Sequence, residues 1–387
     1  MKKAQFVIIG GGVVGASVAF HLTERGAQDV VLLEREKQPG LGSTGKATGG
    51  VRAQFETEIN IKLSLYSIDV FRRFQEITNV DCGYEPRGYL FVATSRDQLD
   101  YLRRNTNRQK SLGLETVEIV DADMIAKMVP GLNVSDVVGG SFCPTDGFIN
   151  PLGVLEGFMK RAIENGTNVL RETEVFQINV KSGKVESIET NRGRVETETV
   201  IVCAGAWSKP IAATAGVKLP VEPLRRQIVW ARSSRDLPEN LPMTIDLATG
   251  FHFRPAKDSN RELLFAYPDR EEKFSLRIDF EESFVDKVYL QARKRAPFLL
   301  DTEIVREKCR AGLYEMSPDH HAILGGCDVE GLYFATGFSG HGVMHSPATG
   351  KALAEIILDG KASFLDVSSL ALERFAQGKL LHETAFI

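Results

Sequence analysis

The sequence predicts an α/β fold (α+β overall) in which a parallel sheet with flanking helices carries an inserted, mainly antiparallel β-sheet domain. Buried strands followed by glycine-rich turns and helices occur at both ends and in the middle of the chain, whereas residues 222–310 show strand-like alternation and many charges. A chain of 387 residues can hold two joined domains. Because no linker-like stretch separates them, the second domain must be inserted into the first.

The first three elements form one unit. Residues 5–9 have the pattern of a buried strand, residues 13–25 that of a helix, and residues 30–33 that of a second buried strand. Gly26 stands where a helix C-terminal glycine belongs. This order predicts a right-handed βαβ unit with parallel strands.

The remaining elements are predicted from the same periodicities and from the glycines and prolines at their ends. They are a helix over residues 57–76, a helix from Pro151 to just before Gly166, strands across residues 169–202 with turns at Ser182-Gly183 and Arg192-Gly193, a strand over residues 332–335 and a helix over residues 347–358.

Charge and cysteine content exclude several classes of protein. A net charge of -4 with both signs interspersed gives no basic surface for nucleic acid. The apolar runs are strand-sized, and the glycines at 10–12 interrupt the run nearest the N-terminus, so we expect neither an integral membrane segment nor a signal peptide. Five scattered cysteines without a CxxC pair favour a reducing cytoplasm over a disulfide framework or a metal site.

A GxGxxG pattern follows the first strand and opens the first helix. Gly10 permits the tight turn, Gly12 lets the backbone approach a pyrophosphate, and Gly15 allows close helix–strand packing. The helix N-terminus offers N–H groups and a positive dipole end to the phosphates. Glu34 ends the second strand, where an acid can bind ribose hydroxyls. The pattern predicts a Rossmann-like dinucleotide site for either NAD or FAD.

Two further glycine-rich stretches favour FAD. Residues 40–52 add hydroxyls and cations beside the first phosphate site, which suits a longer, extended cofactor. Residues 337–342 (GFSGHG) lie between the last strand and the last helix, whose N-terminus can face the electron-rich edge of a flavin ring. Because only one complete GxGxxG unit is present, a nicotinamide-dependent dehydrogenase ranks last.

These motifs resemble the D-amino-acid oxidase superfamily of flavoproteins over essentially the whole chain. The resemblance also rests on AGAWS at 204–208, YEMSPD at 314–319, and RFAQGK at 374–379. The GFSGHG turn is similar to that of the sarcosine oxidase, dimethylglycine dehydrogenase and proline dehydrogenase β-subunit branch. Such proteins oxidise a C–N bond in an amino acid or N-methyl amino acid by hydride transfer to flavin N5, and the imine hydrolyses.

The expected domain division follows from the inserted arrangement. The FAD-binding domain is discontinuous and the substrate-binding domain fills its two gaps. The expected ranges are residues 1–80, 145–221 and 311–387 for the FAD-binding domain, and residues 81–144 and 222–310 for the substrate-binding domain.

The resemblance assigns the FAD contacts. Val175 would contact the adenine and Arg52 would lie over one flavin face. Gly312 stands where monomeric sarcosine oxidases have the cysteine that links FAD covalently. Asn150 stands near the position at which heterotetrameric sarcosine oxidases attach FMN to a histidine. We therefore expect non-covalent FAD and no covalent FMN. The expected cofactor-binding residues are Gly10, Gly12, Val13, Val14, Gly15, Glu34, Arg35, Gly42, Ser43, Thr44, Thr48, Gly49, Gly50, Val175, Ala204, Gly205, Trp207, Gly312, Gly337, Phe338, Ser339, Gly340, His341, Gly342, Val343 and Met344.

Two departures from the family pattern bear on the reaction. Leu264 aligns with a lysine that activates dioxygen near flavin N5, which favours a dehydrogenase over an oxidase. Val343 and Met344 stand where monomeric enzymes have a carboxylate-binding lysine, so carboxylate recognition would have to come from elsewhere.

Hydride transfer from carbon requires a neutral amine, which a general base or an apolar site can supply. His252 lies between two aromatic residues, near the position at which the related enzymes have a substrate-facing tyrosine. It could equally be a structural histidine. His345 could replace the missing lysine or lie on a helix surface. His320 and His321 are not expected to bind a metal, because neighbours on a strand point to opposite faces. The candidate catalytic residues are Arg52, His252, Tyr267, Tyr314 and His345.

The leading hypothesis is an FAD-dependent amino-acid or amine dehydrogenase acting on proline, hydroxyproline, sarcosine or dimethylglycine, alone or as a homo-oligomer or with partner subunits. One alternative is an oxidase of the glycine, sarcosine or D-amino-acid type that forms hydrogen peroxide. Another is a flavin-binding electron-relay subunit without a substrate of its own.

Overall fold

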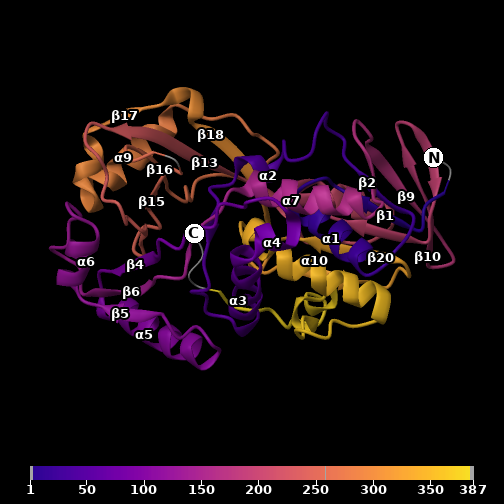
Figure 1. The fold of residues 1–387 in the computed structure, drawn as a ribbon, viewed down its shortest axis with the longest axis horizontal. Helices are drawn as coiled ribbons and strands as arrows, with labels where there is room; N and C mark the ends of the chain where they lie inside the picture. The colour runs from indigo at the N-terminus through magenta and orange to yellow at the C-terminus, as the bar shows by residue number, and fades with distance from the viewer. Residues whose placement is uncertain (1–2, 258, 384–387) are drawn as a thin grey trace.

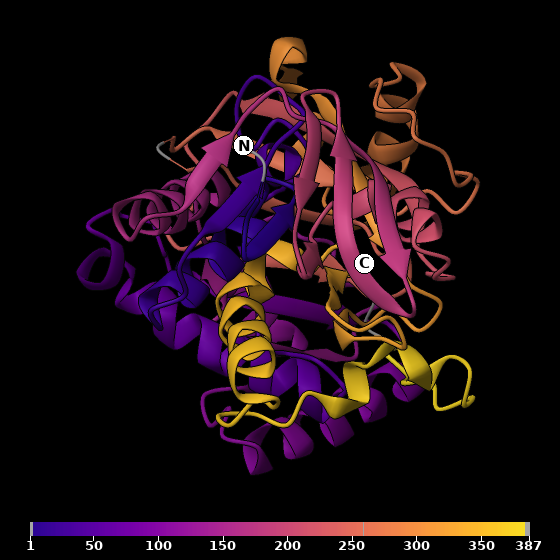
Figure 2. The ribbon, with the colours of Figure 1, turned by 90° about the vertical axis from the view of Figure 1, so that its right-hand side faces the viewer.

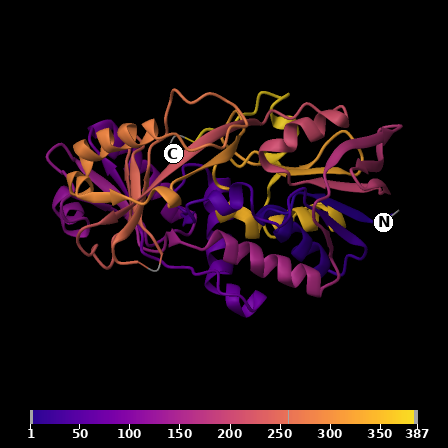
Figure 3. The ribbon, with the colours of Figure 1, turned by 90° about the horizontal axis from the view of Figure 1, so that it is seen from above.

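The chain forms two lobes (Figures 1 and 3). The computed structural model describes residues 3–257 and 259–383. The beginning of the chain (indigo) and its end (yellow) share the first lobe, and the purple and orange segments form the second. The predicted α/β class with an inserted, mainly antiparallel sheet is confirmed.

The first lobe is built on a six-stranded sheet with the order β19-β20-β12-β1-β2-β8. All neighbouring strands are parallel except β19 and β20. The predicted βαβ unit is therefore present. The strands are β1 (Phe6–Ile9), β2 (Val30–Leu33), β8 (Asn168–Leu170), β12 (Thr199–Val202), β19 (Ile323–Gly326) and β20 (Leu332–Thr336).

Helices cover one face of this sheet and a three-stranded antiparallel sheet covers the other (Figure 2). Ile8 and Leu32 pack with the helices, whereas Val7 and Val31 pack with the small sheet, because successive strand residues point to opposite faces. The elements of these layers are α1 (Val13–Glu24), α3 (Glu58–Arg72), α4 (Phe74–Thr78), α7 (Pro151–Glu164), α8 (Ser208–Thr214), α10 (Gly342–Asp359), β9 (Val175–Lys181), β10 (Lys184–Thr190) and β11 (Gly193–Glu196).

The second lobe is built on a nine-stranded sheet with the order β17-β13-β16-β15-β14-β4-β6-β5, in which β18 also pairs with β13. All pairs are antiparallel except β14 with β4. Its elements are β4 (Tyr89–Ala93), α5 (Arg96–Ser111), β5 (Glu118–Val120), α6 (Ala122–Met128), β6 (Gly139–Cys143), β13 (Glu222–Ser233), β14 (Met243–Asp246), β15 (His252–Pro255), β16 (Glu262–Ala266), α9 (Ser283–Arg295), β17 (Thr302–Ile304) and β18 (Arg310–Met316).

Short elements join the lobes: α2 (Ser43–Lys46), β3 (Gly50–Val51) and β7 (Gly147–Phe148). We propose the expected division into FAD-binding and substrate-binding domains for this chain, with β18 as a strand that connects both. Residues 1–2 and 384–387 of the proposed FAD-binding domain lie outside the described residues.

Two predicted helices were wrong in their bounds. The helix expected over residues 57–76 is divided into α3 and α4, because Arg73 leaves the helical conformation (φ -106°, ψ 13°). The last helix begins at Gly342 rather than at residue 347. It accommodates Pro347 because the carbonyl of Val343, deprived of an N–H donor at residue 347, accepts a hydrogen bond from the Ser346 hydroxyl at 2.8 Å.

Three helices in the second lobe were not predicted: α5, α6 and α9. Within the described ranges, no helix combines the length and the apolar character that a membrane span requires.

Candidate active site

A cavity of about 690 Å³ is lined by residues of both lobes. From the first lobe come the ends of β1 and β2, the start of α1 and the GFSGHG turn, and from the second lobe come β13, β14, β15 and β18. Its position at the carboxyl ends of parallel strands is where open α/β sheets bind ligands.

The glycines of the GxGxxG pattern form a cradle that side chains would fill. Gly10 has a φ of +114°, and a Cβ there would collide with the carbonyl of Cys203. A Cβ at Gly15 would collide with the carbonyl of Gly10, so Gly15 serves close packing and does not line the cavity. Gly12 does line it, at the N-terminus of α1. The cradle fits the pyrophosphate of a dinucleotide.

Glu34 lies beside this cradle with a fixed carboxylate. One of its oxygens accepts from the N–H of Gly11 and the other from the N–H of Glu36, both at 2.9 Å. The guanidinium of Arg35 lies 3.8 Å from the ring centroid of Trp207. This end of the cavity therefore offers an acid for ribose hydroxyls and flat surfaces for an adenine.

The second glycine-rich stretch lines the middle of the cavity. Gly312 packs directly against Lys46: a Cβ at Gly312 would lie 2.7 Å from the Cβ of Lys46, and both residues line the cavity. Residue 312 carries no nucleophile, and the residue packed beside it, Lys46, carries an amine that was not among the predicted site residues.

Some residues of the GFSGHG turn line the cavity, and others only hold the turn in place. Gly340 has a φ of +97°, and a side chain there would collide with the ring of Tyr314. Ser339 is buried and its Oγ accepts from the N–H of Ser317 at 3.1 Å, which ties the turn to β18. Gly337 and Ser339 therefore shape the turn without lining the cavity.

Most predicted cofactor residues line the cavity. Those that do so are Gly10, Gly12, Val13, Val14, Glu34, Arg35, Gly42, Ser43, Thr44, Thr48, Gly49, Gly50, Val175, Ala204, Gly205, Trp207, Gly312, Phe338, Gly340, His341, Gly342, Val343 and Met344.

His252 lines the second-lobe wall. Its Nδ1 lies 2.9 Å from the carbonyl oxygen of Gly250, which can only accept, so Nδ1 carries the hydrogen and Nε2 keeps its lone pair. Burial lowers the pKa of His252 to about 4. The ring is thus a neutral hydrogen-bond acceptor at the cavity wall.

Arg52, Tyr267 and Tyr314 also line the cavity. The guanidinium of Arg52 packs over the ring of Phe55 at 4.1 Å and donates to the carbonyl of Gln54 at 2.8 Å. Burial raises the pKa of Tyr314, so its hydroxyl stays protonated and can donate.

His345 does not line the cavity, and it is not a surface residue either. It is 1% exposed, and its Nε2 lies 2.9 Å from the hydroxyl of Ser64 on α3. Because α10 begins earlier than predicted, His345 lies within this helix, where it contacts α3. The expectation of a surface position was therefore wrong.

The position of Leu264 does not support its alignment with an oxygen-activating lysine. Leu264 packs with Ile228 and Ala256 and lies outside the cavity lining. Leu264 therefore gives no support for a dehydrogenase over an oxidase.

Two residues that sequence reasoning missed line the cavity: Arg226 on β13 and Glu315 on β18. Glu315 accepts from the hydroxyl of Thr336 at 2.7 Å, and burial raises its pKa to about 7. Two sequence features could have indicated them. Glu315 belongs to the YEMSPD motif, and Arg226 lies in the stretch 222–310 with strand-like alternation, where neighbouring side chains point to opposite faces.

His320 and His321 lie in the turn between β18 and β19, not on a strand as assumed. His321 Nδ1 lies 2.6 Å from the carbonyl of Asp319, and its Nε2 lies 2.9 Å from the hydroxyl of Thr57. In the part of the chain that the structure describes, no group of three or more His, Cys, Asp or Glu residues is placed to hold a metal ion.

A Rossmann-like lobe, a phosphate cradle and a second sheet that lines the same cavity define a two-lobed flavoprotein. The chain belongs to the DAO family of FAD-dependent oxidoreductases, whose family model matches residues 5–356. It is an enzyme of this class and uses FAD.

Similar proteins cover nearly all of this chain. The FAD-dependent oxidoreductase domain-containing protein 1 of Xenopus laevis is 30% identical over 97% of this chain and 83% of its own length. The mitochondrial sarcosine dehydrogenase of Mus musculus is 26% identical over 97% of this chain but 42% of its own length. The solved structure of L-proline dehydrogenase from P. horikoshii is similar with a TM-score of 0.90 and 28% identity, covering 98% of this chain and 100% of that one.

Proposed function

We propose that this protein is a dehydrogenase that oxidises the C–N bond of an amino acid of the proline, hydroxyproline, sarcosine or dimethylglycine type. The observation that carries the proposal is the far end of the cavity, where a neutral His252 and the hydroxyl of Tyr314 stand beside cationic side chains. The similarity to an L-proline dehydrogenase structure supports the same class of substrate.

FAD, when bound, would accept the hydride that leaves the substrate carbon, and the resulting imine would hydrolyse. The residues fit this cofactor: the glycine cradle would hold the pyrophosphate and Glu34 the ribose hydroxyls. Gly312 offers no atom for a covalent bond, so we propose that FAD is held non-covalently.

The residues of the far end would prepare the substrate. A protonated amine has no lone pair, so the reactive form is the neutral amine. In proline, hydroxyproline or sarcosine, the lone pair on His252 Nε2 would accept a hydrogen bond from the amine N–H, which the neutral tertiary amine of dimethylglycine lacks. Two nearby guanidinium groups, of Arg52 and Arg226, disfavour a positive charge on any of these substrates. The hydrogen bond would orient the amine, and the two positive charges would favour its neutral form.

Anaerobic titration of the purified FAD-bound protein with the four proposed substrates, with glycine and with D-amino acids tests the proposal. Loss of the oxidised flavin absorbance with one of the four, followed by slow recovery in air, is the expected result. Rapid recovery in air, with formation of hydrogen peroxide, would instead identify an oxidase. The alternative is considered because the chain shares its fold with a glycine oxidase from Geobacillus kaustophilus (TM-score 0.84, 24% identity, covering 97% of this chain and 99% of that one). No reduction by any amine would contradict the proposal and favour an electron-relay subunit.

A further inference from the structure

Arg225 and Arg226 are neighbours on β13 and therefore point to opposite faces of the second-lobe sheet. Arg225 is directed away from the cavity, and Arg226 lines it. The two side chains differ sharply in the partners that they have.

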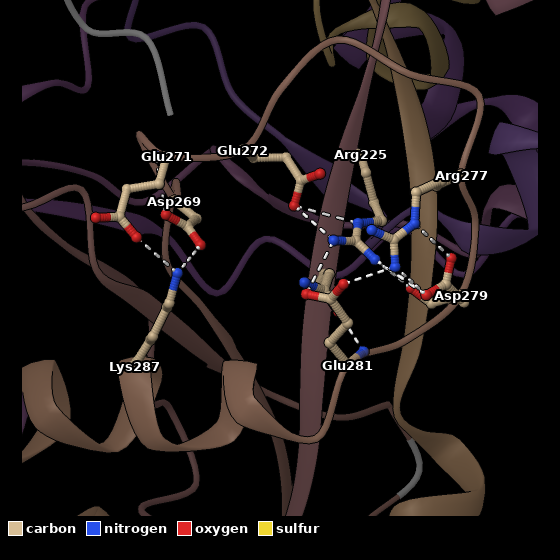
Figure 4. Close-up of polar contacts among 9 residues, drawn as sticks. Arg225, Asp269, Glu271, Glu272, Arg277, Asp279, Glu281 and Lys287 are labelled. Atoms are coloured by element: carbon tan, nitrogen blue, oxygen red, sulfur yellow. Dashed lines mark hydrogen bonds and ion pairs between the residues drawn. The ribbon is translucent and has the colours of Figure 1, made fainter.

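Arg225 is fully engaged (Figure 4). Its guanidinium is nearly buried and contacts Glu272 at 2.8 Å, Glu281 at 3.0 Å and Asp279 at 3.4 Å. These acids belong to the segment between β16 and α9, which also supplies Tyr267 and Ile278 to the cavity wall. Arg225 therefore has a structural role, because its ion pairs fix this segment over the sheet.

Arg226 has no comparable partner. Its Nε is buried without a hydrogen bond, and no residue in the ranges 3–257 and 259–383 forms a hydrogen bond or ion pair with its side chain. Its contact is the ring of Tyr314, whose centroid lies 5.6 Å from the guanidinium carbon. A mostly buried guanidinium without an anion is unfavourable, and burial lowers its pKa.

Among the described residues that line the cavity, no acid forms an ion pair with Arg226. The charges of Glu272 and Asp269 act on Arg226, but these two acids lie outside the lining and are paired with Arg225 and Lys287. Arg52 adds a second positive charge near Tyr314 and His252, and Met243 and Ile245 make the adjacent wall apolar. The acids of the lining lie elsewhere: Glu34, Glu36 and Glu174 near β2 and β9, and Glu315 bonded to Thr336. An anionic ligand in the cavity would supply the partner that the Arg226 guanidinium lacks.

We propose that Arg226 binds the carboxylate of the substrate and thereby selects amino acids over amines that lack a carboxylate. This inference rests on the proposed function and specifies its substrate class. A guanidinium fork matches a carboxylate in two-pronged geometry, and its attraction is strong in a site that excludes water. It also replaces the recognition that Val343 and Met344 do not offer.

The test uses the FAD-bound protein and two unreactive probes, acetate and cyclopentanecarboxylate, with cyclopentanecarboxamide as the uncharged control. Binding is measured as the change in the visible flavin spectrum, so it requires no turnover. We expect Arg226→Met to weaken carboxylate binding at least about 30-fold, as for truncation of one partner of a buried charge pair. Arg226→Lys should weaken it less, and carboxamide binding should not change.

Arg232→Met is the matched control, because Arg232 lies on the same strand but is half-exposed and paired with Glu262. It should leave carboxylate binding unchanged. Equal carboxylate affinity in native protein and Arg226→Met, or no carboxylate effect on the native spectrum, would overturn the inference. Loss of FAD from Arg226→Met would also overturn it, because the guanidinium would then hold the cofactor. Absence of reduction by any amine would count against the proposed function but would leave this binding test intact.

Discussion

The hydroxyl of Thr44 accepts a hydrogen bond from the backbone N–H of Val13 at 3.1 Å. This contact joins the second glycine-rich stretch to the first residue of α1. The neighbouring hydroxyl of Ser43 donates to the carbonyl of Leu313 on β18 at 2.7 Å. The phosphate cradle, α2 and the strand that carries Tyr314 are thus fixed relative to one another, and the cofactor site depends on all three.

Gly12→Val should produce protein without bound FAD. A Cβ at this position would already lie 3.3 Å from Thr44 Oγ1, and the larger side chain would enter the cavity where the pyrophosphate is expected. The ratio of flavin to protein absorbance measures the effect. Gly326→Ala is the control, because Gly326 lies outside the cavity lining and its Cβ would make only an ordinary contact with Tyr333 at 3.5 Å, so FAD should be retained. Normal flavin content in Gly12→Val would contradict the placement of the cofactor.

His252→Ala should slow anaerobic flavin reduction about 100-fold while FAD stays bound, because the substrate amine loses its hydrogen-bond acceptor. Since burial lowers the pKa of His252 to about 4, the ring keeps its acceptor form from pH 5 upward. The native reduction rate between pH 5 and 9 should therefore follow ionisation of the substrate amine. Stopped-flow absorbance measures both effects. A native inflection near pH 6.5 that the variant lacks would show that His252 titrates normally.

Glu315→Gln should change the pH dependence of stability. Burial raises the pKa of Glu315 from 4.5 to about 7, so the folded protein retains a proton that the unfolded chain releases between these values. The stabilisation is complete below pH 4.5 and is lost as the pH rises through about 7. The variant should therefore gain stability relative to the native protein on going from pH 5 to 8.5, by up to about 3 kcal/mol. Urea unfolding at several pH values measures this difference, and a difference independent of pH would refute the assignment.

Arg374→Met should destabilise the protein by about 3–5 kcal/mol, because it leaves the buried Asp319 carboxylate unpaired. The two groups form a two-pronged pair with N–O distances of 2.8 and 2.9 Å, and both side chains are almost fully buried. Chemical denaturation gives the magnitude. Removal of the exposed Arg25–Asp359 pair by Arg25→Met should cost less than about 1 kcal/mol. Equal effects of the two substitutions would argue against a stabilising role for the buried pair.

Features that depend on neighbours in the chain could be predicted from the sequence alone. The parallel βαβ unit follows from apolar four-residue strands and from Gly26, and the roles of Gly10 and Gly15 follow from a turn with positive φ and from close packing. Glu34 could be placed because the length of one helix and one strand determines its distance from Gly10. Most of the residues predicted to bind FAD therefore line the cavity, although their contacts with FAD stay a prediction.

Features that depend on distant segments were decided by the tertiary structure. The alternation of side chains along a strand predicts that Arg225 and Arg226 point to opposite faces of the sheet. Only the ion pairs of Arg225 with acids of residues 272–281 show that Arg226 is the arginine that lines the cavity. Leu264 lies outside the cavity because it packs with Ile228 and Ala256 from neighbouring parts of the same sheet, and His345 is buried because the start of α10 packs against α3. The periodicity of a strand or helix determines the direction in which each side chain points. The groups that the side chain contacts are determined by chain segments far away in the sequence.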